Sequence, residues 1–156
     1  MFSHKEPEFV GYNISFRFTD TSGNDLSKNI NLTDSIYRLD IIISEPCNGW
    51  DNDIYNTPGS DTSRPKFSQP IADSPYLVSY FYLPVDECPP MKKLTYRIRF
   101  PALFGNDLTH EIVSYWDVPP ITKYATCFRI EFDGKEIIPT IGPDRTHSLV
   151  TIVLDK

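Results

Sequence analysis

A stretch of polar and aromatic residues in the first half of the chain, CNGWDNDIYNTPGSD at 47–61, holds side chains well suited to chemistry. An aromatic ring offers an apolar face to a sugar or a peptide, and nearby carboxylates and amides fix the ligand's orientation. A second tryptophan ends a later strand-like segment. The candidate ligand-binding residues are Trp50, Asp51, Asp53, Tyr55 and Trp116. The structural alternative is that these rings fill the open ends of the fold beneath the loop.

A metal site is the first chemistry to test against this stretch. Asp51 and Asp53 are two residues apart in the sequence, and hard cations prefer clustered oxygen ligands. An EF-hand loop would need glycine at its sixth position and glutamate at its twelfth, where this stretch has Thr62. The histidines form no His-x-x-x-His pair and the cysteines no Cys-x-x-Cys pair, the spacings that zinc sites use. The sequence predicts no metal site and no cofactor.

Catalytic motifs are also missing from the sequence, which has no G-x-S-x-G, H-E-x-x-H, Walker A or G-x-G-x-x-G pattern. His110 adjoins Glu111, but neighbouring residues of a strand point to opposite faces and cannot act together. One alternative stays open: a hydrolase whose site assembles at the strand ends from some of His110, His147, Cys127 and the Asp51–Asp53 pair. The lack of motifs favours a protein that is not an enzyme.

Composition limits the class of protein. The chain has 156 residues, the size of one domain. It is 40% hydrophobic and 13% aromatic, unlike a disordered tail, which lacks apolar surface to bury. Its 14 prolines argue against a helix bundle, because proline interrupts helices. Its net charge is −6 and its longest basic run is Lys92–Lys93, so nucleic acid is not expected as a partner.

Membrane and disulfide signals are weak. No apolar run approaches the ~20 residues that span a bilayer, and the longest, at 76–85, is interrupted by Ser79. The first residues, MFSHKEPEF, contain no apolar signal segment. Three cysteines allow at most one internal disulfide, and a bridge between Cys47 and Cys88 is one open alternative.

Alternating apolar residues predict the secondary structure. In VGYNISFRFT at 10–19, every second residue from Val10 to Phe18 is apolar, which is typical of a half-buried strand. Asp133–Gly134 predicts a tight hairpin, because a type I′ turn needs positive φ at both central residues. The segment from Pro101 to Gly105 allows little more than one helical turn. Further strands are predicted at 35–44, 76–83, 93–100, 110–116, 124–132 and 147–155.

These segments predict an all-β fold: an antiparallel β-sandwich, immunoglobulin-like, of seven to eight strands, with a β-barrel as the alternative. Residues 45–74 carry four prolines and no sustained periodicity, so we expect one long loop there, holding at most a short edge strand. Residues 1–9 are expected to form a polar N-terminal tether. Residues 10–156 are expected to form a single β-sandwich domain.

Several segments together resemble a known family. SFRFTDTSGNDL, YRLDIII, LTYRIRFPALFGND, THEIVSYW and FDGKEI follow one another in an order similar to that of small surface lipoproteins of gut Bacteroidales. The resemblance implies a single β-sandwich domain at the outer-membrane surface, held by an N-terminal lipid anchor, with no catalytic residues to transfer. SHKEPE resembles the tether of such proteins, and the sequence shows neither a lipidation signal nor its cysteine.

The function expected from the sequence is a non-enzymatic cell-envelope binding or adhesion module. Its partner would be a glycan or a protein, recognised through the aromatic residues of the long loop. Contact with a membrane is expected only through the lipid anchor. The alternative functions are a structural subunit of a larger envelope assembly and, less favoured, the hydrolase described above.

Overall fold

The computed structural model describes residues 9–43, 66–69, 74–84, 90–118, 124–143 and 145–155, which form an all-β fold, as predicted. Its short helical elements are a 3-10 turn, Asp34–Ile36, and α1, Pro101–Phe104. Across these residues, no helix is long and apolar enough to cross a membrane. The strands are β1 (Phe9–Thr19), β2 (Arg38–Ile43), β3 (Tyr76–Pro84), β4 (Lys93–Arg99), β5 (Thr109–Asp117), β6 (Tyr124–Phe132), β7 (Lys135–Ile137), β8 (Thr140–Ile141) and β9 (Ser148–Val153).

The strands form one mixed sheet of nine strands in the order β2-β4-β5-β6-β1-β9-β8, with β3 also paired to β1 and β7 to β6. The prediction of purely antiparallel pairing is wrong, because β1 runs parallel to both β6 and β9. Ile14 near the start of the chain pairs with Ser148 near its end. Alternation along a strand determines which face is buried, but it carries no information about which distant strand becomes the neighbour.

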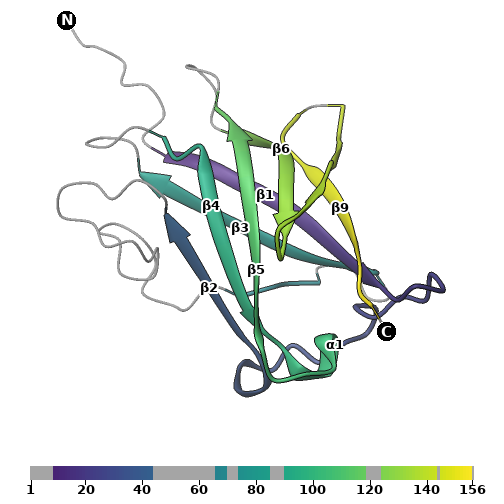
Figure 1. Cartoon of the computed structure of the whole chain (residues 1–156). Helices are drawn as coiled ribbons and strands as arrows, with labels where there is room; N and C mark the ends of the chain where they lie inside the picture. The colour runs from purple at the N-terminus through teal and green to yellow at the C-terminus, as the bar shows by residue number, and fades with distance from the viewer. Residues whose placement is uncertain are drawn as a thin grey trace, which may run out of the picture.

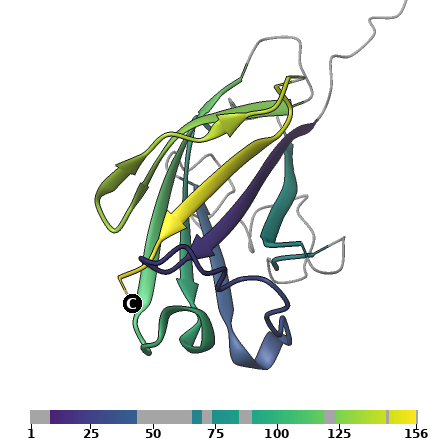
Figure 2. The ribbon, with the colours of Figure 1, turned by 90° about the vertical axis from the view of Figure 1, so that its right-hand side faces the viewer.

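The sheet folds over at β6, so that its strands lie in two layers. The first two residues of β6 pair with β1, whereas the rest of the strand pairs with β5. Figure 1 shows β1 and β3 crossing behind β4 and β5, and Figure 2 shows the same layers from the side. Rings from unpaired strands meet between them: the centroids of Phe16 and Tyr96 are 5.5 Å apart and those of Tyr12 and Trp116 are 5.1 Å apart.

In β1, β2 and β4 the buried residues are those that the alternation predicts, whereas in β6 the alternation fails, since Tyr124 and Phe128 are exposed and Ala125 and Cys127 are buried. In β1, every second residue is buried: Val10, Tyr12, Ile14, Phe16 and Phe18. The same holds for Leu39, Ile41 and Ile43 in β2 and for Leu94, Tyr96 and Ile98 in β4. Burying one such side chain contributes about 1.5–3 kcal/mol relative to leaving it in water.

The two predicted turns are confirmed. Asp133 and Gly134 have φ values of 47° and 89°, and they join β6 to β7 in a tight hairpin. Helix α1 is a single turn, and it ends at Gly105, which has a φ of 75° and donates its N–H to Pro101 O. Glycine suits this position because it has no Cβ to clash in the left-handed conformation.

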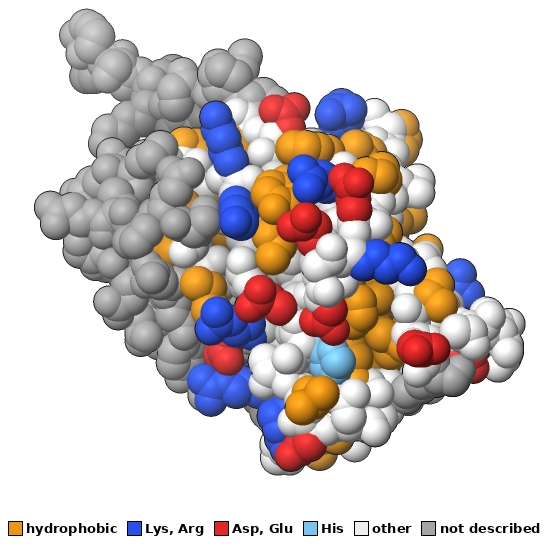
Figure 3. Space-filling view, viewed as in Figure 1, with side chains coloured by type: hydrophobic (Ala, Val, Ile, Leu, Met, Phe, Trp, Pro, Cys, Tyr) orange, Lys and Arg blue, Asp and Glu red, His pale blue; other side chains and the backbone are white. Residues whose placement is uncertain are grey.

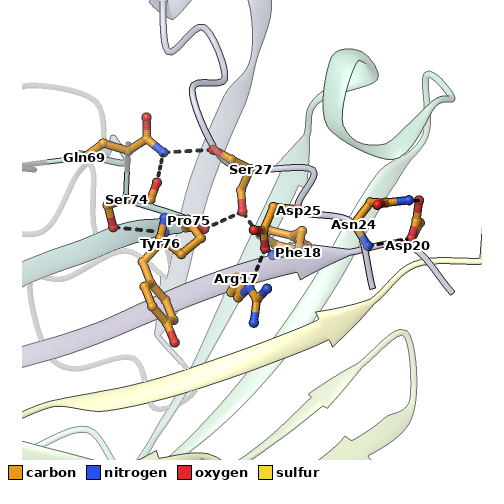
Figure 4. A network of polar contacts seen from close by, with 10 residues as sticks. All are labelled: Arg17, Phe18, Asp20, Asn24, Asp25, Ser27, Gln69, Ser74, Pro75 and Tyr76. Carbon is orange, nitrogen blue, oxygen red and sulfur yellow. Dashed lines mark hydrogen bonds and ion pairs between the residues drawn. The ribbon is translucent and has the colours of Figure 1, made fainter. Parts of the chain in front are cut away.

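The expected long loop, 45–74, lies mostly outside the described residues. In its described part, Phe67 is buried and Ser68 exchanges two backbone hydrogen bonds with Val78 of β3, of 2.9 and 2.8 Å. The Gln69 side chain donates to the backbone oxygens of Ser27 and Ser74, as Figure 4 shows. This part of the segment therefore extends the sheet beside β3 by a single bridge.

Candidate functional site

Exposed tyrosines cluster on the outer face of the β1–β3 layer. The inward residues of β3 alternate with outward ones, and the outward ones include Tyr80 and Tyr82, which are 43% and 57% exposed. Tyr124, the first residue of β6, is 39% exposed. We call Tyr80, Tyr82 and Tyr124 the tyrosine platform.

Strand pairing brings the platform together around a glycine. Gly11 of β1 pairs with Tyr82 on one side and with Tyr124 on the other. A Cβ atom at Gly11 would lie 3.0 Å from Cδ1 of Tyr124 and 3.2 Å from the hydroxyl of Tyr80. The absence of a side chain at Gly11 thus allows the rings to lean over the backbone of β1. The rings of Tyr80 and Tyr82 meet edge to face, with centroids 5.2 Å apart.

Hydrogen bonds connect the hydroxyl groups of the platform. Burial raises the pKa of the Tyr80 hydroxyl above its ordinary value of 10.0, and hydrogen bonds with Tyr82 and Tyr124 raise it further. The Tyr80 hydroxyl therefore joins the three rings into one hydrogen-bonded group. Such a surface offers apolar ring faces for packing together with hydroxyls for hydrogen bonds, the combination that amphipathic ligands require.

An unsatisfied oxygen lies beside the platform. Asn13 follows Gly11 by two residues and pairs with Tyr80 across the β1–β3 ladder. Its Oδ1 is buried and has no hydrogen-bond partner among the described residues. A buried acceptor without a donor costs about 1–3 kcal/mol, so a ligand or water hydroxyl that reached this oxygen would recover that free energy.

Of the site residues predicted from the sequence, only Trp116 lies within the described residues. Trp50, Asp51, Asp53 and Tyr55 lie outside the described residues, as do Cys47 and Cys88. Trp116 is only 2% exposed, and its indole Nε1 donates to Ser114 Oγ at 2.7 Å. It points inward because it follows the buried Ile112 and Ser114 at even spacing along β5. Trp116 is therefore a core residue, not an exposed ring.

Among the described residues of the hydrolase alternative, no hydrogen bond joins His110, His147 and Cys127. The His110 ring lies against Phe104, with centroids 4.0 Å apart, and its Nδ1 lies 2.8 Å from Asp133 Oδ2. His147 instead contacts Ser15, with 3.1 Å between Nε2 and Oγ. Cys127 is fully buried, and burial raises the pKa of its thiol to about 12. Each of the three has its own partners, and the Asp51–Asp53 pair lies outside the described residues.

The outer face of the other layer carries charges of both signs, interspersed over β4 and β5 in Figure 3. Arg97 pairs with Glu111 at 3.2 Å, and Arg129 lies 2.8 Å from Glu136 and 3.2 Å from Glu131. Exposed pairs of this kind contribute about 0–1 kcal/mol each. Nowhere in the described part of the chain do three His, Cys, Asp or Glu side chains gather as a metal site would require.

Comparison with known proteins gives no match: no family model, no curated protein and no solved structure corresponds to this chain.

Proposed function

We propose that the protein is a non-enzymatic binding module that recognises a glycan through the tyrosine platform. The observation that carries the proposal is the gathering of three exposed tyrosines around Gly11, from strands far apart in the sequence. Tyrosine rings can pack against the apolar faces of sugars, and their hydroxyls can donate hydrogen bonds to sugar hydroxyls or accept them. The Oδ1 atom of Asn13 can accept a further hydrogen bond from a sugar hydroxyl.

We also propose that the protein works at the outer-membrane surface, held by an N-terminal lipid anchor. The resemblance to small surface lipoproteins of gut Bacteroidales supports this, and the segments that carry it include β2, β5 and the β6–β7 hairpin. The two-layer arrangement is compatible with an immunoglobulin-like sandwich, which stays a prediction. A structural role in an envelope assembly stays the alternative.

Substitution of the most exposed ring tests the proposed function. We expect Tyr82→Ala to lower the affinity for a glycan found on an array by at least about fivefold, because truncating a central aromatic contact removes more than ~1 kcal/mol. The free energy of unfolding should change by less than about 1 kcal/mol, since the side chain is 57% exposed. Gly11→Ala should also weaken binding, because the new Cβ displaces Tyr124 or Tyr80.

Ile138→Ala is the matched control, since Ile138 is an apolar residue 67% exposed outside the platform. It should leave glycan binding unchanged. The proposal is wrong if the wild type binds no glycan above background, or if Tyr82→Ala binds as the wild type does. Binding of a protein partner alone would favour the other ligand class that the sequence allows.

A further inference from the structure

A separate hollow of about 400 Å³ opens where β5 ends. Its volume lies within the range of small-molecule sites, roughly 300–1,000 Å³. Four segments contribute to it: the residue before β4, the end of β5, the middle of β6 and the turn before β9. The lining residues are Lys92, Trp116, Asp117, Val118, Phe128 and Arg145.

A β-bulge directs Phe128 to this hollow. Tyr115 pairs with Arg129, but the next residue of β5, Trp116, pairs with Cys127, so Phe128 is an extra residue in β6. Bulges change the direction of a side chain and are frequent beside binding sites. Phe128 is 45% exposed although it lies in the middle of a strand. The bulge therefore gives the hollow an accessible aromatic ring.

Arg145 is held in an unusual backbone conformation at the edge of the hollow. Its φ of 60° is uncommon for a residue with a side chain. Two hydrogen bonds keep it there: its N–H donates to Gly142 O at 2.9 Å, and its carbonyl accepts from the hydroxyl of Thr126. Strained backbone that the surrounding structure maintains in this way is concentrated at ligand sites.

The hollow also carries two positively charged side chains, those of Lys92 and Arg145. Neither Lys92 nor Arg145 forms an ion pair with another residue in the described part of the chain. The backbone of Lys92 is fixed, because its carbonyl accepts the N–H of Trp116 at 2.8 Å. Among the described lining residues, Asp117 is the one carboxylate against two cations, in a protein whose net charge is −6.

We propose that this hollow binds a small organic anion, a carboxylate attached to a body the size of one or two rings. The carboxylate would lie between Lys92 and Arg145, whose guanidinium can donate two parallel hydrogen bonds to it. The ring would pack against Phe128, and Asp117 would accept a hydroxyl of the ligand and disfavour polyanions. The proposal does not depend on the tyrosine platform, because the two sites share no residue.

Titration of the full chain by NMR tests the proposal. Three probes are used. Sodium glucuronate is an acidic sugar and sodium benzoate is an aromatic acid. Glucose is the neutral counterpart of glucuronate and serves as the control. We expect saturable shifts of the amides of residues 92, 116–118, 128 and 145 with at least one carboxylate and none with glucose. If the shifts saturate with glucuronate alone, the ligand class is an acidic sugar. If they saturate with benzoate alone, the ligand class is an aromatic acid.

Arg145→Gly is the decisive variant, because glycine adopts a φ of 60° without strain and the fold should be at least as stable. It should weaken carboxylate binding by at least about tenfold, the usual effect of losing a hydrogen bond to a charged group. Lys92→Met should also weaken binding. Asn29→Gly is the control, since Asn29 has a φ of 57° outside the hollow, and it should bind as the wild type does. Equal shifts with glucose, no saturation with either acid, or unchanged binding by Arg145→Gly would overturn the proposal.

Discussion

Cys127 illustrates how burial changes the chemistry of a single residue. Its side chain is fully buried, and burial raises the pKa of the thiol to about 12. Only the thiolate reacts as a nucleophile, so at neutral pH this cysteine is inert for two reasons, protonation and inaccessibility. The sequence alone could not exclude it as the nucleophile of a hydrolase.

We expect that iodoacetamide at pH 8 does not alkylate Cys127 in the folded protein but does so in denaturant. The measurement is the mass of the proteolytic peptide that contains residue 127, before and after unfolding. The unfolded sample is the control, since there the pKa returns to an ordinary thiol value of about 8.5. Rapid alkylation of the native protein would contradict the burial of this side chain.

The exposed tyrosines and Trp116 show how much could be predicted from the sequence about single residues. Simple alternation along YLVSYFYL places Tyr80 and Tyr82 on the same face, but it does not say which face is exposed, because the buried face carries Ser79. The neighbours of these two rings could not be predicted either, because Gly11 and Tyr124 join them only through the pairing of β1 with β3 and β6. The inward direction of Trp116, by contrast, follows from alternation along β5.

Among the elements, the segment after β1 is attached to β3 by a buried serine (Figure 4). The Ser27 hydroxyl donates to Pro75 O at 2.6 Å and accepts the N–H of Phe18 at 3.1 Å. The Ser27 carbonyl accepts from Gln69 at 2.8 Å. One residue thus connects the end of β1, the start of β3 and the bridge beside it.

Ser27→Ala should lower the free energy of unfolding by about 1–3 kcal/mol, because it removes a partner from two backbone groups at a fully buried position. Urea denaturation followed by circular dichroism measures the change. Ser22→Ala is the matched control, since Ser22 is exposed, and its effect should stay within about 0.5 kcal/mol. Equal stabilities of the two variants would show that the Ser27 contacts are not important for stability.

The strands themselves were largely predictable. Period-two alternation located β1 to β6 and β9 to within a few residues, and Asp133–Gly134 located the hairpin that leads to β7. The two-residue β8, Thr140–Ile141, was missed because it is too short to show a period. The parallel pairing of β1 was missed because it joins strands that are remote in the sequence. The hollow was missed for the same reason, since a bulge and three other segments form it.

At the scale of the whole molecule, β1 connects the two layers. It pairs with β3, β6 and β9, and its inward side chains contact rings of the opposite layer. Its pairing with β9 joins the first strand of the chain to the last. Because such contacts have a high sequence separation, most of the chain must be ordered before they form.

Native-state hydrogen exchange can test this central position. We expect the hydrogen-bonded amides of β1 to exchange only through global unfolding, so that their exchange free energy equals the unfolding free energy from denaturation, for a domain of this size about 5–15 kcal/mol. The amides of β8 should exchange at a clearly lower free energy, because this two-residue strand pairs with β9 alone. If amides in β1 exchanged as readily as those in β8, β1 would not be the strand that holds the layers together. The folding unit would then have to lie in β4, β5 and β6, the strands that pair consecutively in the other layer.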